Sequence, residues 1–510
     1  MTPPLKWYCI SQIHEVTFKL NFIIMNKKKL SPLMESYLQI MRKAAASNDG
    51  ERCMIGPNPE LKLKLKKEFK KLKKELGSFS LGNLLKPEGK TRLGMNDGML
   101  QPGNVFPLGT SAIRVRSMSA VKTPVRGTLR VIIVLVDFSD KTFTHSKKNF
   151  QDLFFSEGVI PTGSVKEYYK EVTNGLINIA GEVVGPYRMP RSLKAYANNG
   201  AGTDNGLPNA RTMCMDAAKA ANADVNFSLY DNDKDGYVDA FVVIHAGRGA
   251  EETGNNNDIW SHKWVFPSVF NADGTHVYAY LTVPEDCKLG VCAHELGHLL
   301  FGFPDLYDDD YTSEGIGEWC LMAGGSWNNG GLTPAHPCAW CKSDQNWVTT
   351  VNLSNNKKAV EIEDVKKSNT VYRMWKDGGP GSEYFLMENR LKKNFDKYLP
   401  GEGMLIYHID DAMSSNANEM HYKVAVVQAD NKKHLETGAN QGDTSDVWPG
   451  SLNKKTFSNG SKPNSKSYGG LPTNVAARNI KFNAGKITAD LYVKSGPATS
   501  PKKKSLIKRR

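Results

Sequence analysis

The stretch VCAHELGHLLFGFPDLY, residues 291–307, decides how this chain of 510 residues is interpreted. Its centre is an H-E-x-x-H pattern made by His294, Glu295 and His298. At about 3.6 residues per turn, the two histidines stand one above the other on one helical face, where both imidazoles can reach one ion. Glu295 lies beside them, within reach of a metal-bound water. The pattern therefore predicts a hydrolytic metal site on a helix.

The flanking residues favour a half-buried helix over a solvated helix that carries two surface histidines. We expect this helix over about residues 288–301, ended by Gly302 and Pro304. The turn that follows brings in carboxylates, of which Asp305 comes first. The apolar residues that argue for burial are Leu296, Leu299, Leu300 and Phe301.

A catalytic Zn²⁺ usually takes three protein ligands and keeps a fourth position for water, so a residue besides His294 and His298 is needed. Asp305 is the first candidate for the third ligand. Glu318, twenty residues past His298, is the alternative, and the sequence leaves both open. Such a zinc would activate a water for attack on a peptide carbonyl, with Glu295 as the general base.

The run of residues 294–307, followed by the segment around Met322, resembles the immune inhibitor A family of zinc metallopeptidases, which are relatives of the metzincins. The resemblance covers about residues 125–495. It implies a secreted zinc endopeptidase with calcium sites and a Met-turn beneath the metal. Further stretches similar to this family are residues 130–138, 164–169, 239–249 and 383–410.

The chain departs from the usual metzincin-like spacing in the loop after the second histidine. Gly302 follows His298 by four residues and Asp305 follows it by seven, so the loop is one residue longer than in that spacing. This departure bears on the identity of the third zinc ligand. The chain also has Gly324 and Gly325 where many metzincins place a tyrosine after the Met-turn.

A second metal signature is the acidic loop DNDKDGYVD, residues 231–239. Oxygen ligands at alternate positions, with a glycine at the sixth, are what a calcium loop requires. The twelfth position is Val242, so this is not an EF-hand. A solvated acidic turn is the alternative to a structural Ca²⁺ site. The expected calcium ligands are the side chains of Asp231, Asp233, Asp235 and Asp239 and the carbonyl of Tyr237.

The net charge of +13 belongs to the two ends of the chain. Residues 1–120 carry 21 Lys and Arg against 9 Asp and Glu, and residues 496–510 carry six positive charges, which leaves a net −5 for residues 121–495. Nucleic acid is therefore not an expected partner of the central region. We expect protein or peptide substrates and a monomer.

Residues 58–77 form the clearest helical pattern in the chain. Asn58 suits the N-cap, Pro59 the first helical position and Gly77 the stop. Apolar residues form a stripe along one side of this helix, and eight lysines occupy the other sides. Two interpretations compete: a pro-segment helix docked on the acidic catalytic unit, which we favour, and a membrane-surface contact. The stripe consists of Leu61, Leu65, Phe69, Leu72 and Leu76.

Eight cysteines are few for a disulfide scaffold of this length. Cys53, just before the basic helix, is interpreted either as an ordinary thiol, the commoner case, or as a thiolate that blocks the zinc in a latent form. Residues 1–45 lack the pattern of a signal peptide, which leaves an intracellular location open. The family resemblance implies an extracellular one.

The periodicities predict an α+β fold: a metzincin-like catalytic domain with a twisted sheet and an active-site helix, followed by a β-sandwich-type domain. Residues 276–283 are expected to be the edge strand that pairs with an extended substrate. The expected organisation is a basic N-terminal region at 1–120 that includes the pro-segment, a zinc metallopeptidase domain at 121–350, a β-rich accessory domain at 351–495 and a disordered basic tail at 496–510.

Within the catalytic region, strands are expected at about 129–137, 177–184, 239–246 and 275–282, and helices at about 147–156, 164–173, 208–221 and 288–301. Later strands are expected at 359–363, 384–390, 403–409, 422–428 and 487–493. Two classes of function remain: a zinc metalloendopeptidase, and a non-catalytic metal-containing binding or adhesion module with the same fold. The intact Glu295 favours the enzyme.

Overall fold

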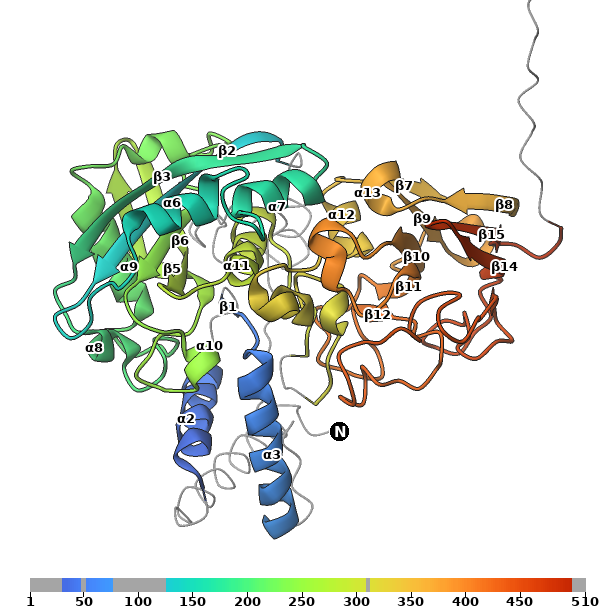
Figure 1. Cartoon of the computed structure of the whole chain (residues 1–510), viewed down its shortest axis with the longest axis horizontal. Coiled ribbons are helices and arrows are strands. Elements are labelled where there is room, and N and C mark those ends of the chain that lie inside the picture. The colour runs from blue at the N-terminus through green and yellow to red at the C-terminus, as the bar shows by residue number, and fades with distance from the viewer. Residues whose placement is uncertain (1–29, 47–51, 77–124, 309–311, 498–510) are drawn as a thin grey trace, which may run out of the picture.

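The computed structural model describes residues 30–46, 52–76, 125–308 and 312–497, without the side chains of 45–46 and 72–76. The expected basic tail lies almost entirely outside these residues. The described part is a mixed α+β protein, as the sequence predicts, with a unit that contains the H-E-x-x-H motif, a β-rich unit and a pair of N-terminal helices (Figure 1).

A six-stranded sheet in the order β1-β5-β6-β4-β2-β3 organises the unit that contains the motif. Strands β3, β2, β4 and β6 are adjacent in this order and all run parallel to one another. Strand β5 runs antiparallel to β6. Residues 131–136 are all buried, the continuous apolar run expected of a parallel strand covered on both faces. The strands are β1 (Cys53–Met54), β2 (Gly127–Asp137), β3 (Ile177–Arg188), β4 (Phe241–His245), β5 (His262–Ala272) and β6 (Thr275–Pro284).

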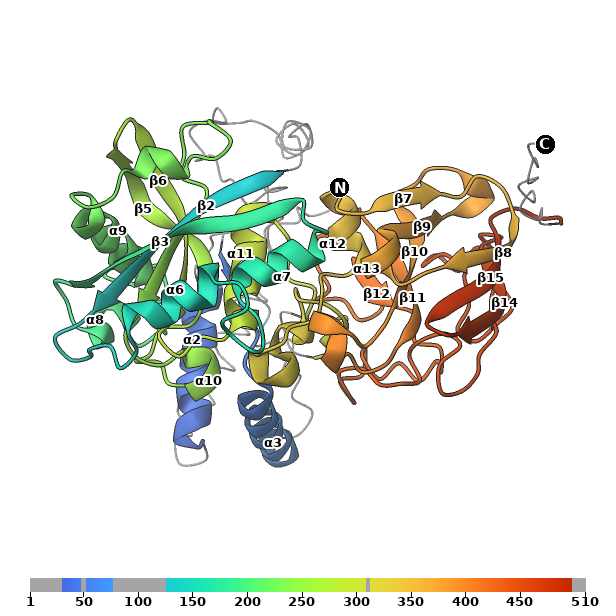
Figure 2. The same cartoon turned by 45° about the horizontal axis from the view of Figure 1, so that its top comes forward.

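Helices α6 and α7 cross in front of the sheet in Figure 2, with α11 beside α7. Helix α9 packs against β5, β2, β3 and β6. The four helices expected in this region therefore all form, with ends shifted by no more than two residues. The helices of this unit are α6 (Lys147–Phe155), α7 (Val165–Val172), α8 (Leu193–Ala197), α9 (Ala210–Ala221), α10 (Ala250–Thr253), α11 (Leu289–Phe301) and α12 (Ala339–Asp344). Short 3₁₀ helices lie at Phe227–Tyr230, Gly317–Trp319 and Gly324–Gly331.

The expectation that residues 276–283 form the substrate-pairing edge is wrong. These residues belong to β6, which lies between β5 and β4 inside the sheet. The outer strand is β5, and β1 adds to its free side. Strand β5 contains Pro267 and a break in register between Val265 and Phe270, features that suit an edge strand and hide the alternating pattern.

The β-rich unit contains two sheets, in the orders β12-β11-β10-β9-β7 and β13-β14-β15-β8. Side chains from both sheets share one core that includes Met374, Phe385, Ile406 and Leu491. All five strands expected here form, and β7, β9, β13 and β14 were not expected. The elements are β7 (Thr349–Asn352), β8 (Lys357–Ile362), α13 (Val365–Ser368), β9 (Thr370–Met374), β10 (Glu383–Arg390), β11 (Gly403–Asp410), β12 (Val424–Val426), β13 (Thr456–Phe457), β14 (Ala476–Asn483) and β15 (Lys486–Tyr492), with 3₁₀ helices at Lys376–Gly378 and Asn394–Tyr398.

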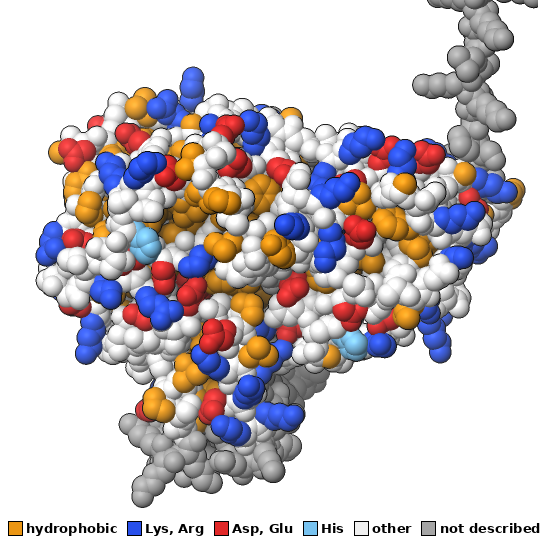
Figure 3. Space-filling model, in the orientation of Figure 1, with side chains coloured by type: hydrophobic (Ala, Val, Ile, Leu, Met, Phe, Trp, Pro, Cys, Tyr) orange, Lys and Arg blue, Asp and Glu red, His pale blue; other side chains and the backbone are white. Residues whose placement is uncertain are grey.

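The N-terminal helices α2 (Pro32–Ala46) and α3 (Pro59–Leu76) lie below α10 and α11 in Figure 1. Helix α3 confirms the predicted helix, and the Asn58 side chain accepts a hydrogen bond from the Leu61 amide, as an N-cap does. Helix α2 was not expected. Lysines colour this part of the surface in Figure 3, and Lys64, Lys67, Lys70 and Lys71 are exposed.

The apolar stripe of α3 is at least partly covered by protein. Leu61 and Leu65 are buried, and the Phe69 ring packs edge-on against Tyr37 of α2. This half of the stripe is therefore unavailable to a membrane surface, while the side chains of Leu72 and Leu76 are outside the description. Among the described residues, no helix has the length and apolar character needed to cross a bilayer.

Candidate metal centre

Helix α11 holds the two histidines of the motif in a completely buried setting. The Nδ1 atom of His294 lies 2.9 Å from the Leu321 carbonyl, and Nδ1 of His298 contacts the Phe303 carbonyl. A carbonyl can only accept, so each ring carries its proton on Nδ1. This leaves the Nε2 lone pairs, which are 3.0 Å apart, directed at one point.

Asp305 completes this arrangement. The αL turn at Gly302 ends α11 and returns the chain, so that Asp305 Oδ1 lies 3.1 Å from His294 Nε2 and 3.0 Å from His298 Nε2. Zinc–ligand bonds of 2.0–2.1 Å in a tetrahedron place ligand atoms about 3.3 Å apart, close to these distances. Three electron-pair donors thus converge in a buried place, an arrangement that a cation stabilises.

The pKa of His298 reflects the same charge distribution. Burial lowers the pKa, but the neighbouring Cys53 and Asp305 outweigh burial and hold it well above the usual range. The negative charge of Asp305 beside His298 also favours a metal cation.

Glu318, the alternative third ligand, lies elsewhere among the described residues. It is part of the 3₁₀ helix at Gly317–Trp319, and its charged neighbours are Glu314 and Lys392. Burial, followed by the charge of Glu314, raises the pKa of Glu318. The geometry therefore favours Asp305, which the longer loop still delivers to the histidines.

Glu295 is placed beside the three converging atoms and is fully buried. Its Oε1 accepts the Ile55 amide at 3.1 Å, whereas Oε2 is buried with no hydrogen-bond partner among the described residues. Burial raises the pKa of Glu295 well above its usual range, and the charge of Asp305 adds to this. A buried carboxylate oxygen of this kind needs a hydrogen-bond donor such as water.

Met322 lies beneath the helix, as a Met-turn methionine would. Its carbonyl accepts the Leu306 amide at 2.7 Å, and its Sδ would lie only 2.8 Å from a Cβ added to Gly297. A glycine inside the motif thus lets the sulfur approach the helix closely.

Comparison with known proteins agrees with this geometry. A sequence model of the catalytic domain of immune inhibitor A peptidase M6 matches residues 119–354, which include all of α11, Asp305 and Met322. We refer to residues 119–354 as the M6 domain, after the family model that they match. This region is thus similar to the catalytic domain of a metallopeptidase family, in line with the resemblance seen in the sequence.

Two named relatives match over the same region. The chain is 30% identical to immune inhibitor A of Bacillus thuringiensis subsp. alesti over 299 residues, covering 46% of this chain and 43% of the relative. It is 29% identical to the pre-pro-metalloprotease PrtV of Vibrio cholerae serotype O1 (strain M66-2) over 288 residues, covering 44% of this chain and 31% of the relative. The chain spans less than half the length of these relatives.

The acidic loop of the M6 domain gathers three of its expected side chains. Carboxylate oxygens of Asp231, Asp233 and Asp239 lie within 4.8 Å of one another, whereas the Asp235 side chain accepts the Tyr237 amide at 2.9 Å. Burial, with the charges of Asp233 and Asp235, raises the pKa of Asp239 well above its usual range. One Asp239 oxygen is buried with no hydrogen-bond partner among the described residues.

A segment that precedes the M6 domain crosses its candidate metal centre. Residues 52–57 run from α2 to α3 past the histidines, and Cys53 Sγ groups with ligand atoms of His298 and Asp305, all within 4.8 Å. The sequence singled out Cys53, but nothing in its pattern shows that β1 pairs with a strand about 210 residues later.

Three aromatic residues of the M6 domain bind the main chain of this segment, and sequence reasoning missed all of them. The Tyr307 hydroxyl donates to the Met54 carbonyl, and its ring stacks on His294. Indole N–H groups of Trp260 and Trp327 donate to the carbonyls of Ile55 at 2.7 Å and Gly56 at 3.1 Å. Tyr307, two residues after Asp305, is the one whose position could have drawn attention.

The CxxC pair of the M6 domain belongs to a larger group of thiols. Cys338 and Cys341 have sulfur atoms 3.8 Å apart, and Cys320 joins them in a buried cluster. Cys320 Sγ accepts the amides of Met322 and Cys338. This cluster lies just behind the Met322 segment and is distinct from the candidate metal centre.

Proposed function

We propose that this protein is a zinc-dependent endopeptidase in which His294, His298 and Asp305 hold the metal. The observation that carries the proposal is the convergence of two Nε2 atoms and one carboxylate oxygen at mutual distances of 3.0–3.1 Å. The match to the M6 family makes zinc the expected metal. Glu318 has no part in this set.

The residues present fit a catalytic zinc, which would supply Lewis-acid polarisation of a carbonyl and a water of lowered pKa. A backbone carbonyl contacts Nδ1 of each histidine and fixes the orientation of the ring before a metal binds to Nε2. Glu295 is the general base: its Oε2 is buried without a hydrogen-bond partner among the described residues, so it can accept a proton from water and pass it to the leaving amine.

Tyr307 is proposed to hold the carbonyl of the bond that is cut. Its hydroxyl already donates to a main-chain carbonyl beside Glu295, and its ring lies against a metal-holding histidine. A donor at this position would bind the charge that develops on the carbonyl oxygen during attack. Tyr307 would thus do the work that a tyrosine after the Met-turn does in many metzincins.

We further propose that the acidic loop binds a structural Ca²⁺. Asp231, Asp233 and Asp239 would supply carboxylates and Tyr237 its carbonyl, whereas Asp235 would shape the turn through its hydrogen bond to the Tyr237 amide. Burial of several carboxylates against one another is costly unless a cation binds them.

The finer assignment of the fold is also a proposal. We assign the M6 domain to a metzincin-like arrangement with Met322 in the Met-turn, and the β-rich unit to a β-sandwich. Protein or peptide substrates follow from the peptidase family, and we propose that the protein is monomeric and acts outside the cell. The Vibrio relative is named a pre-pro-metalloprotease, which is compatible with an N-terminal segment that restrains this enzyme.

The test compares Glu295→Ala with Glu318→Ala in the full chain. Casein cleavage is measured before and after brief treatment with trypsin, which is then stopped by a trypsin inhibitor, because residues 52–57 cross the site. We expect Glu295→Ala to keep its metal and lose cleavage, and Glu318→Ala to keep both. Undiminished cleavage by Glu295→Ala would overturn the enzymatic assignment. Metal binding without cleavage by the activated wild type would favour a non-catalytic binding module.

A further inference from the structure

Residues 52–57 lie along the edge of the catalytic sheet as an added strand. Strand β1 pairs antiparallel with β5, with Cys53 opposite Lys263 and Met54 opposite His262. Figure 1 shows β1 beside α11, between the N-terminal helices and the sheet. Adding a strand to a free sheet edge is a common way for proteins to bind an extended peptide. The segment thus occupies the position that a peptide substrate would take on β5.

The peptide group between Met54 and Ile55 is bound as a reacting peptide would be. Its carbonyl accepts the Tyr307 hydroxyl, and its N–H donates to Oε1 of Glu295 at 3.1 Å. The carbonyl partner is the group expected to stabilise the developing negative charge. The amide partner is the group expected to protonate the leaving nitrogen.

Cys53 brings a sulfur atom to the metal centre from the residue before this peptide group. Its Sγ lies within 4.8 Å of the ligand atoms of His298 and Asp305, and its side chain is buried. Two histidines and one aspartate leave the fourth position of a tetrahedral zinc, which a thiolate can fill. Cys53 therefore lies close enough to His298 and Asp305 to compete with the attacking water for this position.

Contacts on both sides of Cys53 hold the segment in this register. Downstream, Trp260 and Trp327 bind the carbonyls of Ile55 and Gly56, and the Asn58 amide donates to the Glu251 carbonyl at 2.9 Å. Upstream, the Arg52 guanidinium lies 5.1 Å from the centre of the Trp264 ring and donates to the Ala44 carbonyl at 2.7 Å. These contacts are mostly to main chain, so they would suit many peptide sequences.

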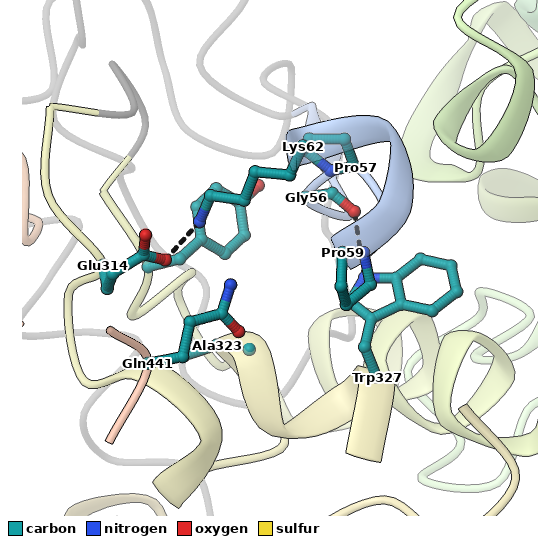
Figure 4. A pocket seen from close by; sticks show the side chains of 10 residues that line it. Gly56, Pro57, Pro59, Lys62, Glu314, Ala323, Trp327 and Gln441 are labelled. Atoms are coloured by element: carbon teal, nitrogen blue, oxygen red, sulfur yellow. Dashed lines mark hydrogen bonds and ion pairs between the residues drawn. The ribbon is translucent and has the colours of Figure 1, made fainter. Parts of the chain in front are cut away.

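Helix α3 fastens the segment to the M6 domain through a buried ion pair. Lys62 and Lys66 both bind the carboxylate of Glu314, of which only 2% is exposed. Figure 4 shows the Lys62 ammonium directed at Glu314 and the Trp327 indole directed at Gly56, across a small pocket that both parts of the chain line. A carboxylate this deeply buried is costly without its lysines, so release of α3 is opposed.

We propose that residues 52–57 are a built-in inhibitory strand and that the Cys53 thiolate is the fourth ligand of the metal held by His294, His298 and Asp305. This rests on the proposed function, because it takes those three residues as metal ligands. On binding, the S–H bond breaks, a sulfur–metal bond forms and the proton leaves to solvent. The chain is then latent until this segment is displaced or cut away, after which β5 is free to pair with a substrate.

Cobalt spectroscopy tests the ligand without any need for activity. The full chain is stripped with a chelator and reloaded with Co²⁺, and the near-ultraviolet sulfur-to-cobalt charge-transfer absorption is recorded for wild type, Cys53→Ala, Cys53→Ser and Cys214→Ala. Any Co²⁺ at the cluster of Cys320, Cys338 and Cys341 contributes equally to all four, so the difference from wild type is the measurement. We expect a loss of absorption in both Cys53 variants and none in Cys214→Ala, whose thiol is buried in α9. Equal absorption in wild type and Cys53→Ser would overturn the proposal.

Latency is tested with the same proteins by casein cleavage before trypsin treatment. Loss of the ligand that blocks the position of the attacking water should raise basal cleavage severalfold in Cys53→Ala and Cys53→Ser, with Cys214→Ala unchanged. Basal cleavage that stays at the wild-type level in both Cys53 variants, while trypsin activates all of them, would refute an inhibitory role of the Cys53 thiolate. If trypsin activates none of them, the proposed peptidase function fails, and the cobalt spectra still decide whether Cys53 is a ligand.

Discussion

Replacing Tyr307 by phenylalanine separates two roles that one hydroxyl could have. In the structure the hydroxyl donates to the Met54 carbonyl, while the ring stacks on His294 with centroids 6.4 Å apart. Phenylalanine keeps the ring and removes only the hydroxyl. The metal-holding histidine should therefore stay in place, and the zinc content should not change.

The two roles predict different losses of free energy when the hydroxyl is removed. A hydrogen bond to a bound carbonyl contributes about 0.5–1.5 kcal/mol, equivalent to about 2- to 12-fold in binding. A donor to the developing oxyanion contributes about 2.7–4 kcal/mol, or about 10²- to 10³-fold in kcat. Because the hydroxyl sits beside Glu295 and against a metal-holding ring, we expect the larger effect, seen in kcat.

The assay measures kcat and KM on a quenched fluorescent peptide with trypsin-activated full-length protein. Tyr187→Phe is the matched control, because its hydroxyl bonds to Asp224 away from the metal centre. A change confined to KM, with kcat reduced less than about tenfold, would refute the catalytic role and leave Tyr307 as a residue that only binds the peptide.

Three further predictions follow from buried carboxylates. Glu314→Gln should loosen the attachment of α3, so that trypsin cleaves the chain faster and basal casein cleavage rises. Glu60→Gln alters an exposed ion pair on the same helix and should change neither rate. Asp239→Asn should abolish the rise in Tm that added Ca²⁺ is expected to give the wild type, and an equal rise in the variant would contradict a calcium site. Burial raises the pKa of Glu251 to about 7 from an ordinary value of 4.5, so the folded state keeps a proton that the unfolded chain loses. Stability should therefore fall by about 3 kcal/mol as pH rises through this window. In urea unfolding at about pH 5 and about pH 8, Glu251→Gln should lose that fall and Glu252→Gln should keep it; an unchanged fall in Glu251→Gln would contradict the assignment.

Local patterns predicted much of this fold because their causes are local. The helix over residues 58–77 follows from its cap, its proline and its apolar period, and α3 begins at Pro59 as expected. The buried strand at 129–137 follows from a continuous apolar run, and β2 contains it. The motif helix and its glycine stop follow in the same way.

What the sequence could not predict depends on long-range contact. Strand β1 has two residues and exists only because β5 offers it a free edge. Strand β5 itself was missed because Pro267 and a register break disrupt its alternation. The choice between Asp305 and Glu318 likewise depends on how the loop after α11 folds back, which spacing alone does not determine. The position of Tyr307 beside the histidines depends on the fold of that same loop.

The most direct test of the account is a crystal structure of the full chain with an anomalous difference map at the zinc absorption edge. We predict a peak bonded to Nε2 of His294 and His298 and to Oδ1 of Asp305, with Cys53 Sγ in the fourth position. A peak bonded to Glu318 in place of Asp305, or no peak between the two histidines, would contradict it.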